Sequence, residues 1–186
     1  MAQGAYIIGS SGNQADITSN KELIVQAPTG IRAASVLGNA YAWTAVLANI
    51  DTTDCMILVS NTSATQNLVI HKVIFQGDIV GTMTFKLADC TGLTLAGTAI
   101  AGINLNTGSG KSAPASAFSD ETASPATSVI MTWNQHLPYA AVVGVMNVFD
   151  TEDAIIVTQH HAFGVDTILE PAAGFQATVI GYYIDA

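Results

Sequence analysis

Residues 108–112 (Gly-Ser-Gly-Lys-Ser) resemble the end of a phosphate-binding loop more closely than any other segment resembles a catalytic motif. That loop needs a glycine five residues before the glycine of its Gly-Lys pair, and this chain has Leu105 there. It also joins a strand to a helix, whose N-terminal amides bind the phosphate. Here a stretch rich in Ala, Ser and Pro follows Lys111. We therefore interpret the segment as a loop and expect no nucleotide site.

The four histidines do not have the spacing of metal ligands. His160 and His161 are neighbours, and adjacent residues of a strand point to opposite faces, so they cannot easily hold one metal. His71 lies within an expected strand, and His136 precedes an expected turn. The pattern favours surface and loop histidines, although a site shared by several copies of the chain on a trimer axis stays open.

Two acidic groups, Asp51/Asp54 and Asp150/Glu152/Asp153, could offer oxygen ligands to Ca²⁺. Neither group has the spacing or the glycine of an EF-hand loop. Asp and Thr are also the residues whose side chains bond to backbone amides in turns. We therefore prefer the turn interpretation and expect no metal.

A hydrolytic site is not indicated either. The chain has no Gly-x-Ser-x-Gly elbow, and neither Cys55 nor Cys90 has a histidine beside it in sequence. Fourteen acidic residues always offer pairs, so counting does not exclude a paired-carboxylate glycosidase. Five basic residues leave little to stabilise a developing anion. We expect no enzyme and no cofactor, and two free thiols in a reducing compartment.

Short apolar runs rich in β-branched residues, separated by turn residues about every 8–12 positions, indicate an all-β sandwich or barrel. Residues 82–87 alternate with period two, which is typical of a strand with one wet face. Residues 92–105 indicate two weak strands, and residues 33–37 could form a helical turn. The strands expected are residues 23–25, 41–47, 56–59, 68–75, 82–87, 128–133, 141–146, 154–158, 167–169 and 175–184.

The chain divides into an arm and one domain. Residues 1–20 are polar and rich in Gly, Ser and Asn, and we expect an extended N-terminal arm. Residues 21–186 should form a single β-sandwich, because the length fits one domain. Residues 107–128 are rich in Gly, Ser, Ala, Thr and Pro, and they predict a long flexible loop.

The low charge of the chain points to an assembly. Charged residues make up 10% of the sequence, against about 25% in an average soluble domain. An uncharged exterior suits tight contact between subunits, because no ions lose their water when it is covered. The other explanation is a surface of Ser, Thr and Asn on a β-domain that stays alone.

The net charge of −9 also restricts the partners. Nucleic acid and anionic membranes both require clustered bases, so we expect neither as a partner. The N-terminus lacks the basic region of a signal peptide, and no apolar stretch reaches the roughly 18 residues of a membrane span. We therefore expect synthesis in the cytoplasm. The five bases are scattered: Lys21, Arg32, Lys72, Lys86 and Lys111.

Two segments resemble small structural proteins of tailed bacteriophages. Residues 56–70 resemble a sequence pattern common in such proteins. In this pattern a strand ends in an Asn-Thr-Ser loop, and the next strand begins with Asn-Leu-Val-Ile. Residues 174–185 resemble the last strand of jelly-roll virion proteins. The resemblance implies a jelly-roll head decoration (cement) protein: a homotrimer on the capsid surface of the virion, made in the host cytoplasm, bound to the lattice of the major capsid protein.

On this interpretation we expect partner contacts in the arm and in the loop. Tyr6, Ile7 and Ile8 form an apolar cluster on a polar arm, and such a cluster needs a surface to bury it. Lys111 and Phe118 lie in the expected loop.

A competing interpretation is a carbohydrate-binding sandwich or the head of a phage fibre. Exposed aromatic rings stack on sugars, and the same rings could instead belong to the core or to an interface. The aromatic residues in question are Trp43, Trp133, Tyr139, Tyr182 and Tyr183.

Overall fold

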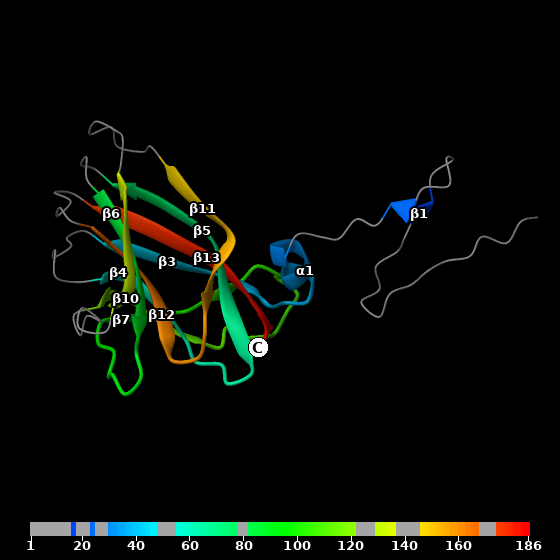
Figure 1. Ribbon diagram of the computed structural model, residues 1–186, viewed down its shortest axis with the longest axis horizontal. Coiled ribbons are helices and arrows are strands. Elements are labelled where there is room, and N and C mark those ends of the chain that lie inside the picture. Colours follow the sequence, from blue (N-terminus) through cyan, green and yellow to red (C-terminus); the bar gives the residue numbers. More distant parts are fainter. Residues whose placement is uncertain are drawn as a thin grey trace, which may run out of the picture.

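Two antiparallel sheets face each other in the computed structural model (Figure 1). The structure describes residues 16–17, 23–24, 30–47, 55–77, 82–121, 129–136, 146–167 and 174–186. The expected all-β sandwich is confirmed, with one short helix, α1 (Gly30–Val36), at one end of the sandwich.

The first sheet has six strands in the order β10-β6-β12-β4-β9-β7. Every neighbouring pair in it is antiparallel. Its strands are β4 (Cys55–Asn61), β6 (Thr82–Asp89), β7 (Thr98–Ile100), β9 (Ala115–Glu121), β10 (Val129–His136) and β12 (His161–Thr167).

The second sheet has five strands in the order β11-β5-β13-β3-β8, also antiparallel throughout. Its strands are β3 (Ala40–Leu47), β5 (Gln66–Gly77), β8 (Ile103–Asn104), β11 (Asn147–Val157) and β13 (Phe175–Asp185).

Eight of the strands pair like one long hairpin that is folded over. Counted along the chain, the first strand of the eight pairs with the last (β3 with β13) and the second with the seventh (β4 with β12). The third pairs with the sixth (β5 with β11) and the fourth with the fifth (β6 with β10). Strands β7, β8 and β9 lie between the fourth and fifth and extend one edge of each sheet.

The inward side chains of both sheets form one apolar core, because alternate residues of a strand share a face. Trp43 of β3 and Val179 of β13 are fully buried in it, and so is Phe163 of β12. Aromatic rings join the layers: Phe75 and Phe85 lie edge to face with centroids 6.4 Å apart, and Phe85 stacks on Phe149 at 4.6 Å.

The prediction of one long loop over residues 107–128 is wrong, because a strand lies in the middle of this segment. Residues 115–121 form β9, which pairs with β4 and β7 inside the six-stranded sheet. The segment is rich in Ala and Ser, which have low β-propensity, but small side chains such as Ala117 fit between two packed sheets. Residues 122–128 lie outside the described part of the chain.

The expected N-terminal arm lies largely outside the described residues. Strand β1 (Asp16–Ile17) pairs antiparallel with β2 (Leu23–Ile24), which is part of the strand expected at residues 23–25. This pairing crosses the expected boundary at residue 20. Tyr6, Ile7 and Ile8 are outside the described residues, so their role stays a prediction.

Candidate interaction surfaces

The C-terminal end of α1 is shaped by Gly38. The Asn39 amide donates to Ala34 O at 2.7 Å and the Gly38 amide donates to Ser35 O at 3.0 Å, which is the double bond pattern of a Schellman cap. Gly38 has φ +70°, and a Cβ there would lie 2.3 Å from Ser109 Oγ. Glycine is therefore required at this position both for its backbone angle and for the packing of the 104–111 segment.

The last carbonyls of this turn are bound by side chains from the 104–111 segment. Asn106 Nδ2 donates to Val36 O at 3.1 Å, and Lys111 Nζ donates to Leu37 O at 2.9 Å. Asn104 Nδ2 donates to Gly38 O at 3.0 Å. Carbonyls at a helix C-terminus carry partial negative charge, so the Lys111 ammonium stabilises them. These bonds fix the position of residues 36–38.

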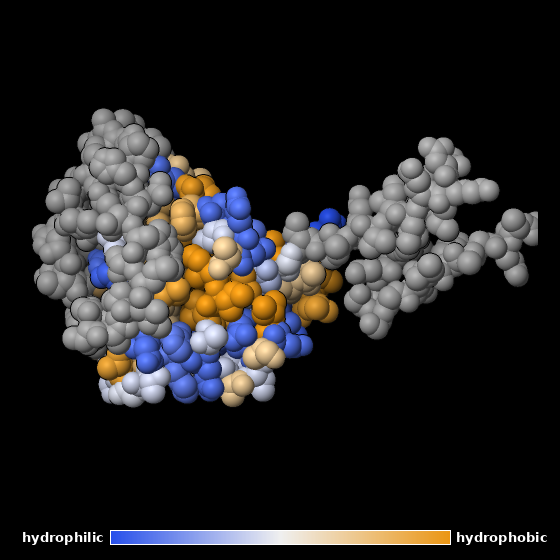
Figure 2. Space-filling model, in the orientation of Figure 1, coloured by the Kyte–Doolittle hydropathy of each residue, from blue (hydrophilic) through white to orange (hydrophobic). Residues whose placement is uncertain are grey.

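The fixed turn presents apolar side chains to solvent. Val36 is 73% exposed and Leu37 is 64% exposed, with Leu105 beside them at 40%. We call Val36, Leu37 and Leu105 the helix-end platform. Figure 2 shows hydrophobic residues gathered around α1 and in the middle of the visible face. A rigid, exposed apolar surface loses little conformational entropy when a partner covers it.

Two cations flank the platform in a chain of net charge −9. Arg32 is exposed and lies four residues before Val36 in α1, a spacing that places both on one side of the helix. Among the described bases, Lys72 and Lys86 form ion pairs with Asp150 and Asp166. Within the same part of the chain, Arg32 and Lys111 form none. The platform is therefore apolar with a positive border.

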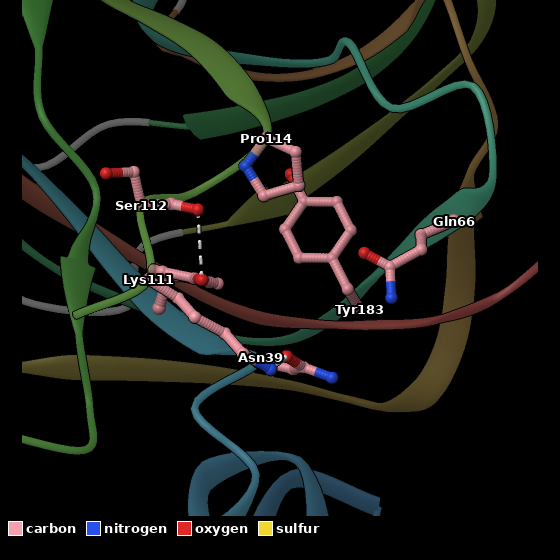
Figure 3. Close-up of a pocket in the computed structure, with 7 residues that line it drawn as sticks. Asn39, Gln66, Lys111, Ser112, Pro114 and Tyr183 are labelled. Atoms are coloured by element: carbon pink, nitrogen blue, oxygen red, sulfur yellow. Dashed lines mark hydrogen bonds between the residues drawn. The ribbon is translucent and has the colours of Figure 1, made fainter. Parts of the chain in front are cut away.

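A pocket of about 420 Å³ adjoins the platform (Figure 3). The Lys111 side chain runs along one side toward Asn39, and its Nζ lies 2.8 Å from Asn39 Oδ1. The Tyr183 ring stands between Pro114 and Gln66 on the other side. The lining is Asn39, Tyr41, Gln66, Lys111, Ser112, Pro114 and Tyr183.

The pocket lacks the pairing that catalysis by a nucleophile requires. The Lys111 amine is bonded to a carbonyl and an amide oxygen, and the Tyr41 hydroxyl donates to Gly38 O and Ser112 O, each at 3.1 Å. Burial raises the pKa of Tyr183, so its hydroxyl stays neutral. These groups hold the 104–114 segment against α1 and β3.

The five-stranded sheet carries a second exposed surface on its outer side. Away from α1, the outward side chains are those that alternate with the core residues, and we call this set the open face. It consists of Ala42, Thr44, Val46, Lys72, Ile74, Gln76, Ile103, Val148, Asp150, Gln176, Thr178 and Ile180.

The outer side of the six-stranded sheet differs, because it is covered. Leu58, Ala88 and Ala162 point away from the main core but are fully buried, and they form a second apolar cluster with Cys55 and Cys90. The expected free thiols are confirmed. Burial raises the pKa of Cys55 to about 12 and that of Cys90 to about 11.

The acidic segment at residues 150–153 forms a bulge in β11. Asp150 Oδ1 accepts the Glu152 amide at 2.9 Å, which confirms the turn interpretation for this group, while Asp51 and Asp54 lie outside the described residues. Glu152 and Asp153 have positive φ, and the register of β11 against β5 shifts across the bulge. Asp153 bonds to His71 at 2.8 Å. In the described part of the chain, no cluster of three or more His, Cys, Asp or Glu could hold a metal.

The remaining histidines have local roles. His160 has φ +62° in the turn before β12, and its amide donates to Asn61 O at 2.9 Å. His161 Nδ1 lies 3.0 Å from Thr158 Oγ1. His136 is the last residue of β10, and the turn expected after it lies outside the described residues.

Of the predicted partner residues, the structure describes Lys111 and Phe118, and it places them apart from each other. Lys111 belongs to the platform border, where its amine is already bonded within the chain. Phe118 is half-buried in β9, where it pairs with Leu58 on the outer side of the six-stranded sheet. The exposed residues Val36 and Leu37 were not predicted. Their exposure depends on the 104–111 segment folding against α1, which no local pattern encodes.

Three of the five aromatic residues considered for sugar binding are buried. Trp43 is fully buried, and Tyr182 and Tyr183 are nearly so. Tyr182 packs under α1 with Ala34 and Val69. The side chains of Trp133 and Tyr139 lie outside the described residues.

Comparison with known proteins gives no relative: no protein-family model, curated protein or solved structure matches this chain. The described part of the chain has no helix of the length and hydropathy that crossing a membrane requires.

Proposed function

We propose that this protein is a structural component of a virion, a capsid decoration (cement) protein that binds the assembled lattice of the major capsid protein. The observation that carries the proposal is the helix-end platform, where exposed Val36 and Leu37 are held in place by hydrogen bonds from Asn106 and Lys111 to their carbonyls. A fixed apolar surface with a positive border fits a protein partner that offers apolar side chains bordered by carboxylates.

The strand order supports this proposal. A long antiparallel hairpin folded over into two sheets is the arrangement of a jelly roll, a fold used by viral capsid proteins. We accordingly propose the jelly-roll assignment, with β7–β9 as an insertion between the fourth and fifth strands. The low charge of the chain agrees with a surface that is covered in an assembly.

The mechanism would be stabilisation by mass action. A subunit that binds the assembled lattice and not its free components lowers the free energy of the assembled state by RT ln(1 + [L]/Kd) per site. Val36 and Leu37 would supply apolar contact, while Arg32 and Lys111 would face carboxylates of the lattice. In a trimer, three such contacts would engage together and add avidity.

Binding to heads tests the platform. Heads assembled from the major capsid protein of the same genome are sedimented with wild-type protein, V36D, L37D and the control L93D. Leu93 is also exposed, in the turn that follows β6, so the control introduces the same charge elsewhere. We expect V36D and L37D to raise Kd by roughly 30-fold, which corresponds to about 2 kcal/mol, with L93D unchanged.

The outcomes of this experiment test the decoration function and the role of the platform separately. Wild-type protein that does not sediment with heads contradicts the decoration function. Equal binding of wild type, V36D and L37D contradicts the platform alone. A variant without residues 1–20 in the same assay tests whether Tyr6, Ile7 and Ile8 contribute, and unchanged binding would remove them from the contact.

Adhesion to a carbohydrate has less support. Stacking on a sugar needs an aromatic face open to solvent, and Trp43, Tyr182 and Tyr183 do not provide one.

A further inference from the structure

The open face differs from an ordinary exposed sheet surface because it carries almost no charge. Lys72 and Asp150 are its only ionisable residues, and they pair with each other at 3.4 Å between Nζ and Oδ2. The face is therefore neutral, in a chain whose net charge is −9.

Apolar side chains extend across the full width of this face. Val148 on edge strand β11 is 56% exposed, Val46 on β3 is 72% exposed, and Ile103 on edge strand β8 is 65% exposed. Ile74 and Ile180 lie between them, half-buried. Large aliphatic residues on a free sheet surface are an unprotected site for association.

The polar side chains of the face are largely bonded to one another. Thr44 and Thr178 are cross-strand neighbours whose hydroxyl oxygens lie 2.9 Å apart. Gln76 Nε2 donates to Gln176 Oε1 at 3.2 Å. Because these groups partly satisfy one another within the face, displacing its water costs less than it would on a face of unpaired polar groups.

We infer that the open face is covered by another copy of this chain. Two copies at −9 each repel, so their contact requires surfaces without net charge, and the open face is such a surface. It offers no net charge by which a different, charged partner could be selected, since its one cation and one anion pair with each other. A flat neutral sheet face is complemented by another one, since two sheets pack face to face about 10 Å apart.

The size of the face fits such a contact. Four strands (β3, β5, β11 and β13), spaced about 4.8 Å apart and contributing up to about six residues each at about 3.3 Å per residue, present roughly 400 Å². A standard interface buries about 800 Å² per partner and weaker ones bury less, so a face of this size fits a weak contact between copies. The face approaches the helix-end platform at Ile103, but Val46 lies at the end of β3 remote from α1, so a substitution there tests the open face alone.

Sedimentation of the purified full chain without heads tests this inference. We expect the wild type to form an oligomer, with the number of copies given by its mass relative to the 19.2 kDa chain. V46D and V148D place a carboxylate at two separate points of the face, and each should shift the protein toward the monomer and weaken association by at least about tenfold. L93D should associate like the wild type.

A second measurement keeps the inference testable if one variant folds poorly. Lys72 lies on the open face and Lys111 does not, so acetylation of Lys72 should be slower in the wild-type oligomer than in the dissociated variant, while Lys111 reacts equally in both. A wild type that stays monomeric at high micromolar concentration overturns the inference. So does an oligomer that V46D and V148D leave intact while their thermal unfolding matches that of the wild type. Since no heads are present, neither result bears on lattice binding.

Discussion

At the scale of residues, burial makes the two thiols unreactive. Cys55 is buried beside Leu58, Ala88 and Ala162 and behaves as a small apolar side chain. Burial raises the pKa of the Cys55 thiol to about 12, and the nearby Asp166 carboxylate acts in the same direction. A neutral, enclosed thiol is neither a nucleophile nor a metal ligand.

This burial predicts the behaviour of both thiols. At pH 8 a thiol reagent should react with neither Cys55 nor Cys90 in the folded protein and with both after unfolding in denaturant. An unfolded thiol ionises near pH 9 and a folded one at higher pH. Above pH 9 the thiols ionise more readily in the unfolded chain, which favours unfolding. The contribution of the buried thiols to the free energy of unfolding is therefore present below pH 9 and lost as the pH rises toward 12.

Denaturant unfolding at a series of pH values, with Cys55→Ala as the control, measures this loss. The variant should show a smaller fall in the free energy of unfolding above pH 9. Rapid modification of folded protein at pH 8 would contradict the burial of the thiols.

The residues of the helix-end platform illustrate what local sequence can and cannot predict. Lys111 was selected as a partner residue because of its position in an expected loop, and the structure instead bonds its amine to the end of α1. The exposure of Val36 and Leu37 could not be predicted, because an apolar pair at the end of a helical turn is equally typical of the buried core. Only the contact between residues 104–111 and α1 decides which way they face.

At the scale of elements, strands with an unbroken apolar pattern were predictable. Strands β3, β5 and β13 lie where the apolar runs place them, within two residues at each end. Strand β12 was missed although it is central, because His161, Gly164 and Asp166 interrupt its pattern. A Cβ at Gly164 would lie 3.0 Å from Cys55 Sγ on the neighbouring strand β4, so packing favours glycine there. Glycine is uncommon inside strands, and it therefore weakens the strand pattern of the sequence.

Gly181 is the element-scale position with the sharpest prediction. Gly181 lies where the register of β13 against β5 shifts. A Cβ there would be 2.7 Å from Val69 O, a backbone atom that no side-chain rotation can move out of the way. G181A should lower the free energy of unfolding by about 1–3 kcal/mol. Gly110 has no atom within 4 Å of its Cβ position, so G110A is the matched control and should be close to neutral.

Denaturant unfolding of the two variants is the measurement. Equal stability of G181A and the wild type would show that β13 tolerates a side chain at this register shift, and the packing described for β5 and β13 would then be wrong.

At the scale of the whole molecule, the sequence predicts an uncharged exterior but not its location. The structure separates the two sides of the sandwich: the outer side of the six-stranded sheet is covered, and that of the five-stranded sheet is open. Composition cannot make this distinction, because both outer sides draw on the same apolar and small polar residues. The distinction follows from packing: Cys90 and Leu95 cover the outer side of the six-stranded sheet, whereas α1 covers only one end of the five-stranded sheet.

Heat stability of the capsid tests the central claim most directly. Heads are heated with increasing amounts of this protein, and the rupture temperature is followed by the release of nuclease-sensitive DNA. A cement protein that binds only the assembled lattice should raise the rupture temperature until every site is filled, and V36D should need a higher concentration for the same effect. A rupture temperature that does not change at saturating wild-type protein would contradict the account.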